Sequence, residues 1–390
     1  MTFTVYLSIT ILTLFLSYFC QKKRIYTSRS FNYFLFFLCF CVHAFFMCFT
    51  RVGTDYDEYI RIIKLLSWNT ITESIEIGFN FLGLLFYSLT NNADSTLFFI
   101  KLLTLVIYYY SFYLIRNRVR IVYSILAFNA FVYFRWYIIG MNLSISILLL
   151  SGVLLVEKKK NILPLILVIL AALVHSSSWL FIPSYLLCYF LFVKKKRISL
   201  IGVLIIVSMY LSIFIFYRQI YSYLIDRFSF FNQYRFYLLI DSNSGSGLLQ
   251  YINFAFIFIY VLVILNNSND KRLVFCSLVF TINAFLFALL AYKMTVFSRI
   301  NNSSLIIYCY FIPCIFGYER WRGTADNKGF VDNKSNICLT SSVIKTKISK
   351  NILRNAWVVY LSINFIFLMS QLLSAGSTSS MNEYEFFWPF

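Results

Sequence analysis

Charged residues are scarce in this sequence of 390 residues. Asp, Glu, Lys and Arg make up only 13% of it, whereas hydrophobic residues make up 60%, and the mean hydropathy is +0.76. A water-soluble domain of this length would have to expose much of that apolar surface to water, so the composition excludes one. We therefore expect an all-α protein that crosses a membrane many times.

The sequence also lacks the signatures of a metal site, a disulfide framework and a cleaved leader. Most of its nine cysteines lie inside apolar runs, and the closest pairs have neither zinc-site spacing nor a second half. The first apolar run, 2–19, has no basic residues before it and no small-residue cleavage site after it. We expect it to be a retained span, and we expect no metal or other cofactor.

About twelve apolar runs are long enough to cross a bilayer, which takes about 17 to 25 helical residues. A further run, 77–90, is shorter and follows an acidic loop, so we expect an interfacial or re-entrant helix there. No internal repeat or separate soluble domain is visible, so residues 1–390 are expected to form one polytopic domain. The expected spans are 2–19, 31–50, 96–115, 119–136, 138–156, 161–176, 178–193, 198–216, 248–265, 273–292, 302–317 and 353–372.

The basic residues gather on one side of these spans. If 77–90 does not cross, six clusters that carry most of the 34 Lys and Arg residues fall on the same face. Short cytoplasmic loops are enriched in Lys and Arg, so this face is expected to be cytoplasmic. The net charge of +19 is then a signal of topology, and we expect no nucleic acid partner. The clusters are 22–28, 116–120, 158–160, 194–197, 271–272 and 319–354.

The opposite face, periplasmic in a bacterium, receives the first outer loop, 51–95, and a larger loop, 217–247. The stretch Arg51–Glu76 carries five of the 15 acidic residues in a chain that is otherwise nearly all membrane. We interpret it as the floor of an active site. The cytoplasmic loop 318–352 is polar and basic, and is expected to be a flexible connection.

Ionisable side chains at membrane depth are the candidates for function. Each costs about 2.5–3.5 kcal/mol on insertion scales, so few remain without a role. Arg135, His175 and Arg299 lie at the outer ends of expected spans. They share that face with Asp55 and Glu76, and these distant parts of the chain can converge there. The structural alternatives are an arginine that only extends its charge to the membrane surface and a histidine that hydrogen-bonds a helix end.

Two further features leave structural and functional interpretations open. The loop 217–247 alternates arginines with aromatic residues, and Arg227 is its best candidate. This composition suits sugar stacking and diphosphate binding, but it also suits an aromatic belt at the membrane surface. His43 has apolar neighbours in the sequence and is expected to be a core residue.

Several short motifs resemble those of EpsG-like proteins and occur in the same order. They are GTDYDEY (Gly53–Tyr59), EIGF (Glu76–Phe79), a helix opened by Arg135, VHSS (Val174–Ser177) and SRINNSSLIIYCYFIP (Ser298–Pro313). The chain departs from the usual pattern where Trp136 and Gly140, in place of Gln and Ala, follow the arginine. The family is similar to the Wzy-type polymerases of O-antigen, capsule and exopolysaccharide.

This resemblance implies a glycosyltransferase of the bacterial inner membrane, with an architecture similar to that of polytopic C-type (GT-C) glycosyltransferases. Its donor and acceptor are then oligosaccharides linked to undecaprenyl diphosphate, and its active site faces the periplasm. The resemblance also implies a chain-length regulator of the Wzz type and a flippase as partners.

Transfer between two such lipids needs a base for the acceptor hydroxyl and cations for the departing diphosphate. Asp55 is the expected base, and His175 is the second catalytic candidate. A planar guanidinium binds phosphate oxygens through two hydrogen bonds, which favours arginine at the diphosphate. The expected substrate-binding residues are Arg135, Arg227 and Arg299, together with Glu76 and Tyr59.

Three other functions compete with a polymerase. A flippase for the same lipid-linked unit should place charged groups at mid-membrane, whereas the middles of these spans are almost uncharged. An O-antigen ligase shares the donor and the topology, and the sequence does not separate it strongly from a polymerase. A histidine-dependent O-acyltransferase would leave the arginines and Asp55 without a role.

Overall fold

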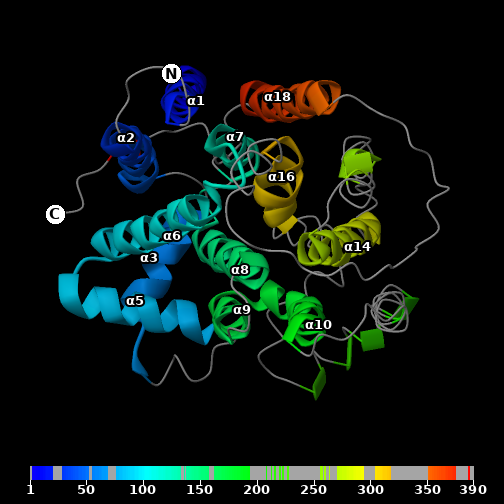
Figure 1. The fold of residues 1–390 in the computed structure, drawn as a ribbon. Helices are drawn as coiled ribbons and strands as arrows, with labels where there is room; N and C mark the ends of the chain where they lie inside the picture. Colours follow the sequence, from blue (N-terminus) through cyan, green and yellow to red (C-terminus); the bar gives the residue numbers. More distant parts are fainter. Residues whose placement is uncertain are drawn as a thin grey trace.

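The computed structural model describes residues 2–20, 29–51, 55–68, 76–132, 136, 138–157, 162–193, 270–293, 304–317, 350–374 and 385–386, with scattered positions between 208 and 263. This part of the chain is nearly all helical, and its helices pack side by side (Figure 1). The elements are α1 (Thr2–Phe19), α2 (Arg29–Cys48), β1 (Thr50–Arg51), α3 (Asp55–Leu65), α5 (Ile77–Thr90), α6 (Ala93–Ile115), α7 (Ile121–Phe131), α8 (Ile139–Glu157), α9 (Leu163–Val174), η2 (Ser176–Phe181), α10 (Ile182–Val193), α14 (Lys271–Lys293), η5 (Ile307–Phe311), α16 (Ile312–Gly317), α18 (Lys350–Ser374) and β2 (Glu385–Phe386).

The helices coincide with the apolar runs of the sequence wherever those runs fall on described residues. Three stretches are long and apolar enough to cross a membrane, namely Ser30–Cys48 within α2, α6 and α8, and several shorter apolar helices accompany them. The chain is thus a helical membrane protein. The expected spans 198–216 and 248–265 and the loops 217–247 and 318–352 lie almost entirely outside the described residues.

Helix α8 is the centre of the bundle. Nearly all of its residues are buried, and it contacts α6, α9, α10 and α14 (Figure 1). Serine and glycine along the helix let its neighbours approach closely, as small residues do between membrane helices. Gly152 is one such position, because a Cβ there would lie 3.2 Å from the Tyr185 hydroxyl oxygen.

Helices α8 and α9 run in opposite directions. The Ser144 hydroxyl, near the start of α8, donates to the carbonyl of Ala171 near the end of α9 at 2.9 Å. The Ser151 hydroxyl, further along α8, donates to the carbonyl of Pro164 near the start of α9 at 2.6 Å. The end of α9 is therefore level with the start of α8.

The end of α2 and the start of α6 lie at this same end of the bundle. Trp136, just before α8, donates its indole N–H to the carbonyl of Met47 near the end of α2 at 2.9 Å. Arg51, just after α2, forms an ion pair with Asp94 in the first turn of α6. We call this end of the bundle, which also holds His175 after α9, the site face.

Arg118, in the turn between α6 and α7, links helices at the opposite face of the bundle. Its guanidinium lies 3.0 Å from Glu157 at the end of α8 and 2.9 Å from Asp270 just before α14. The Tyr310 hydroxyl also donates to Glu157. These contacts hold the second half of the chain to the first at the face where the sequence places the basic clusters.

A buried polar network joins α1, α2, α6 and α7. His43 is fully buried, with Nδ1 2.6 Å from the Tyr109 hydroxyl oxygen and Nε2 2.9 Å from the side-chain oxygen of Asn129. Asn129 in turn donates to the Thr13 hydroxyl at 3.0 Å. Both ring nitrogens of His43 have partners inside the bundle, which agrees with the core position expected from the sequence.

The helix of η5 and α16 is fixed to α7 through a proline. Pro313 has no N–H, so it cannot donate to the carbonyl of Cys309 four residues earlier. The Ser124 hydroxyl of α7 donates to that carbonyl instead, at 2.7 Å. The sequence motif that ends at Pro313 thus packs on the first half of the bundle.

Helix α5 begins and ends at the site face. Glu76, directly before α5, contacts His175, whereas Asn91 ends the helix in the left-handed conformation (φ 50°) just before α6 begins. A spanning helix would have its ends on opposite faces. Helix α5 instead packs across α6 and α9 (Figure 1), in the arrangement expected for the interfacial helix.

The backbone after α18 returns to the site face as well. Strand β1 pairs antiparallel with β2, so that Thr50 lies opposite Phe386 and Arg51 opposite Glu385. The end of the sequence therefore lies beside the first outer loop, on the face where we expect the tail.

The position of α5 can be tested by labelling single cysteines from outside the cell. We expect Asp57→Cys and Asn91→Cys, at exposed positions on either side of α5, to react with a membrane-impermeant thiol reagent. Lys160→Cys should react only after the membrane is opened, because the basic loops are expected inside. Most of the described native cysteines are buried, which keeps the background low. Protection of Asn91→Cys with labelling of Asp57→Cys would show that α5 crosses.

Candidate functional site

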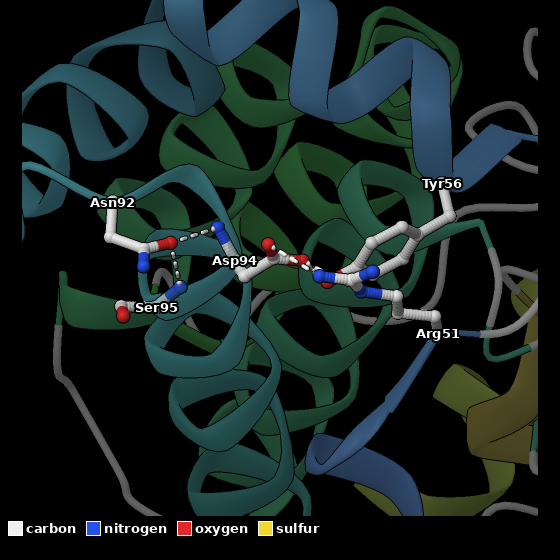
Figure 2. Close-up of polar contacts among 5 residues, drawn as sticks. All are labelled: Arg51, Tyr56, Asn92, Asp94 and Ser95. Atoms are coloured by element: carbon white, nitrogen blue, oxygen red, sulfur yellow. Dashed lines mark hydrogen bonds and ion pairs between the residues drawn. The ribbon is translucent and has the colours of Figure 1, made fainter. Parts of the chain in front are cut away.

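An ion pair holds the start of the first outer loop to α6. Asp94 accepts from Arg51 Nε at 3.1 Å and from a terminal nitrogen of Arg51 at 2.8 Å (Figure 2). It also accepts from the Tyr56 hydroxyl at 2.8 Å. Asn92 orients this turn, because its side-chain oxygen caps α6 by accepting from the N–H groups of Asp94 and Ser95. We call Arg51, Tyr56 and Asp94 the loop clamp.

The clamp keeps its partners in the protonation states that these bonds require. Burial, and then Asp94, raise the pKa of the Tyr56 hydroxyl well above its usual range, so it remains a donor. Burial lowers the pKa of Arg51, but Asp94 and Tyr56 together raise it more, and Arg51 stays charged. The first turn of α3, with Asp55 beside Tyr56, is thereby fixed to α6.

Lys101 lies directly beneath the clamp and is 2% exposed. Its amine donates to the carbonyl of Thr50 at 2.6 Å and lies 4.8 Å from the centre of the Tyr56 ring. Sequence reasoning missed Lys101 and Asp94, since it treated the run 96–115 as apolar and gave Asp94 to a loop. The signal was available, because two charges seven residues apart lie on one face of a helix.

The first outer loop turns helical at Asp55, which opens α3. Asp55 and Tyr59 are four residues apart and therefore share a face of this helix. The Tyr59 hydroxyl accepts from the N–H of Gly140 at 3.3 Å, and its ring lies 5.4 Å from that of Phe79. Helix α3 is thus packed on the starts of α8 and α5. Asp55 is half-buried, whereas Asp57 is exposed.

Glu76 and His175 form a carboxylate–imidazole pair. Glu76 Oε1 contacts His175 Nδ1 and also accepts from the N–H of Ser176 at 3.4 Å. The two side chains are 27% and 24% exposed, so solvent or a substrate can reach them. The pair joins residues 99 positions apart in the chain. We call Asp55, Tyr59, Glu76 and His175 the site cluster.

The pair depends on a close approach of two helix ends at Gly78. A Cβ at this position would lie 3.0 Å from the carbonyl carbon of Leu173 and 3.1 Å from the nitrogen of Val174. A side chain at this position would push the start of α5 and the end of α9 apart by a few tenths of an ångström, so glycine favours their close approach. This close approach explains why the EIGF motif has a glycine at this position.

The three arginines expected at the diphosphate are not part of the described cluster. Arg135 and Arg299 lie outside the described residues, in gaps next to Trp136 and before Ser304. Arg227 is described as exposed, and it makes none of the contacts of the site cluster. No group of three or more His, Cys, Asp or Glu side chains within the described ranges could hold a metal ion.

The site cluster has the groups that proton transfer requires. It offers a half-buried carboxylate, a histidine oriented by a second carboxylate, and a tyrosine ring that packs on Phe79 in the first turn of α5. A histidine can serve as a general base, and an aromatic ring can line a sugar. The arrangement fits acid–base chemistry on a hydroxyl group.

Replacing Gly78 with alanine should separate α5 from α9 and reduce activity strongly. The backbone atoms of Leu173 and Val174 would have to shift by a few tenths of an ångström for the new methyl group, which should weaken the contact between Glu76 and His175. The matched control is Gly140→Ala, whose Cβ would lie 3.4 Å from the Phe79 ring and 3.7 Å from the Tyr59 hydroxyl, in ordinary contact. Glycan gels and membrane abundance measure both variants. Equal activity of the two variants would contradict this account.

Replacing Asp94 with alanine should loosen the loop clamp and lower the thermal stability of the purified protein in detergent. A net loss of about 1 kcal/mol is expected, because the pair is partly exposed and water screens it. Glu58→Ala is the control. Glu58 pairs with Arg61 on the exposed side of α3, so its loss should leave the unfolding midpoint unchanged. An unchanged midpoint for Asp94→Ala would show that the clamp contributes nothing to stability.

Comparison with known proteins places the chain in a family. The model of the EpsG family matches residues 32–325, which include α3, α5, the end of α9 and thus every residue of the site cluster. No curated protein and no solved structure gives a significant match. Since the match covers well over half of the sequence, the chain belongs to the EpsG family.

Proposed function

We propose that the chain polymerises a bacterial surface polysaccharide of the O-antigen type at the periplasmic face of the inner membrane. In this reaction a growing glycan leaves its polyprenyl diphosphate carrier and joins a sugar hydroxyl of a lipid-linked repeat unit. The observation that carries the proposal is the meeting of the acidic first loop, the start of α5 and the end of α9 at one face, inside the region that matches the EpsG family.

This reaction requires one base and positive charge at the leaving group. Asp55 and His175 are the two candidates for the base that takes the proton of the acceptor hydroxyl. We propose Arg135, Arg227 and Arg299 for the diphosphate, because a guanidinium binds its oxygens through two parallel hydrogen bonds. The sequence contains these three arginines, and we propose that they lie at the site.

Tyr59 and Glu76 are proposed to line the acceptor sugar. Both lie next to the start of α8 or the end of α9, where a sugar reaching either base would pass. The reaction uses two lipid-linked substrates and needs no metal in this scheme. A flippase that delivers the repeat units and a Wzz-type regulator of chain length are the proposed partners.

A flippase for the same lipid-linked unit is less well supported. Transporters place charged groups along a pathway at mid-membrane. Among the described spans, Lys101 is the buried lysine, and its amine is directed to the carbonyl of Thr50 at the site face. Arg118, Glu157 and Asp270 meet at the opposite face. The charges of the described helices therefore gather at the two ends of the bundle.

A clean deletion in the source bacterium tests the proposal. The polysaccharide ladder on gels should collapse to a single repeat unit attached to its final acceptor, and the cloned gene should restore it. Loss of all attached glycan, with full-length polymer still on the lipid carrier, would indicate a ligase instead. Loss of all attached glycan with only single repeat units on the carrier would indicate a flippase, because units that stay on the cytoplasmic side meet neither enzyme.

A further inference from the structure

The geometry points to Glu76 and His175 as one acid–base unit, in which Glu76 orients the imidazole so that Nε2 takes the proton of the acceptor hydroxyl. This inference rests on the proposed polymerase function and makes it more specific. It assigns the base to His175 rather than Asp55. It also gives Glu76 a positioning role in place of sugar binding.

The contact fixes which nitrogen of His175 can work. A carboxylate offers only lone pairs, so the nitrogen that faces it, Nδ1, carries the ring hydrogen. Nε2 then keeps its lone pair. No hydrogen bond to Nε2 is made by any residue in the described part of the chain. Since His175 is 24% exposed, an acceptor hydroxyl can approach this atom.

The side chain of Glu76 contacts His175 and does not cap its own helix. A side-chain oxygen at the N-cap position of a helix can accept from the N–H groups of the first turn. Glu76 occupies that position before α5 but makes no such capping bond. Its carboxylate contacts His175 and the N–H of Ser176 instead. The start of α5 therefore has no side-chain cap, and the Glu76 carboxylate holds the histidine instead.

The backbone of His175 is held on both sides. Its N–H donates to the carbonyl of Ala171 at 3.0 Å, and its own carbonyl accepts from the N–H of Ser178 at 3.0 Å. The hydroxyl oxygens of Ser178 and Ser144 lie 2.5 Å apart, which ties this turn to α8. The backbone is thus fixed by its neighbours and the ring by Glu76, so the position of Nε2 is set before substrate binds.

The proposed step balances in atoms and charge. The acceptor oxygen forms a bond to the anomeric carbon of the donor glycan while its proton passes to His175 Nε2. The bond from that carbon to the diphosphate oxygen breaks, and its electron pair leaves with the polyprenyl diphosphate. The imidazole becomes positively charged, and the carboxylate of Glu76 offsets that charge. Attack opposite the leaving group inverts the anomeric configuration.

The test uses the full-length protein in liposomes with purified lipid-linked repeat units. His175→Ala and Glu76→Ala should each slow polymerisation, the first by about 10² to 10⁴, the usual contribution of a general base. The double variant should be little slower than His175→Ala alone, because residues that act as one unit are not additive. Glu76→Gln should retain more activity than Glu76→Ala, since its amide oxygen can still accept from Nδ1.

Two further variants separate a chemical role from a structural one. His175→Asn can still donate to Glu76 from its amide nitrogen but has no Nε2, so it should fold at normal abundance and remain inactive. Added imidazole should restore part of the activity of His175→Ala. Ser177→Ala, in the same turn, removes a buried hydroxyl that has no partner among described residues, and should behave as wild type.

The comparison with Asp55→Asn decides between the two bases. If Asp55→Asn is inactive while His175→Asn and Glu76→Ala polymerise at near wild-type rates, the inference is overturned and Asp55 is the base of a working polymerase. Additive losses from Glu76→Ala and His175→Ala would likewise overturn the idea of a unit. If the wild-type protein itself forms no polymer from these substrates, the proposed function fails, which is a separate result.

Discussion

The close approach of α5 to α9 at Gly78 is the constraint on which the candidate site depends. The start of α5 lies so near the backbone of Leu173 and Val174 that a Cβ at Gly78 would come within 3.0 Å of it. This distance brings Glu76 to His175, although 99 residues separate them. It also brings Phe79 to Tyr59, and thereby α3 to the same place. The absence of a Cβ at Gly78 thus allows the contacts that join α3, α5 and α9.

Polar side chains in a bilayer must find partners inside the protein, and this rule accounts for much of the remaining structure. His43 is satisfied by Tyr109 and Asn129 within the core, and Lys101 by the carbonyl of Thr50. Both groups connect helices that the sequence separates widely. They stabilise the helices beneath the site face, where Glu76 and His175 are partly exposed.

The sequence predicted the helices far better than their contacts. A short apolar helix was expected at 77–90, directly after the acidic loop, and the structure places α5 there. The convergence of Glu76 and His175 on one face followed from loop charge. Their direct contact did not, since it depends on how two helix ends approach in space. Asp94 was assigned to a loop, although Asn92 before an apolar run is a helix-start signal that extends α6 to include it.

An apolar stripe runs along the exposed surface of α5. Ile77, Phe81, Leu85 and Leu89 follow one another at four-residue spacing and are 41% to 73% exposed. Such a stripe is unfavourable in water but favourable at a membrane surface, where an amphipathic helix buries its apolar side among the lipids. A helix α5 that lies in that plane would place Glu76, directly before it, and His175 at the depth of lipid headgroups. In the proposed function, a diphosphate attached to a polyprenyl chain would be held at that same depth by its own tail and would reach the pair without leaving the membrane.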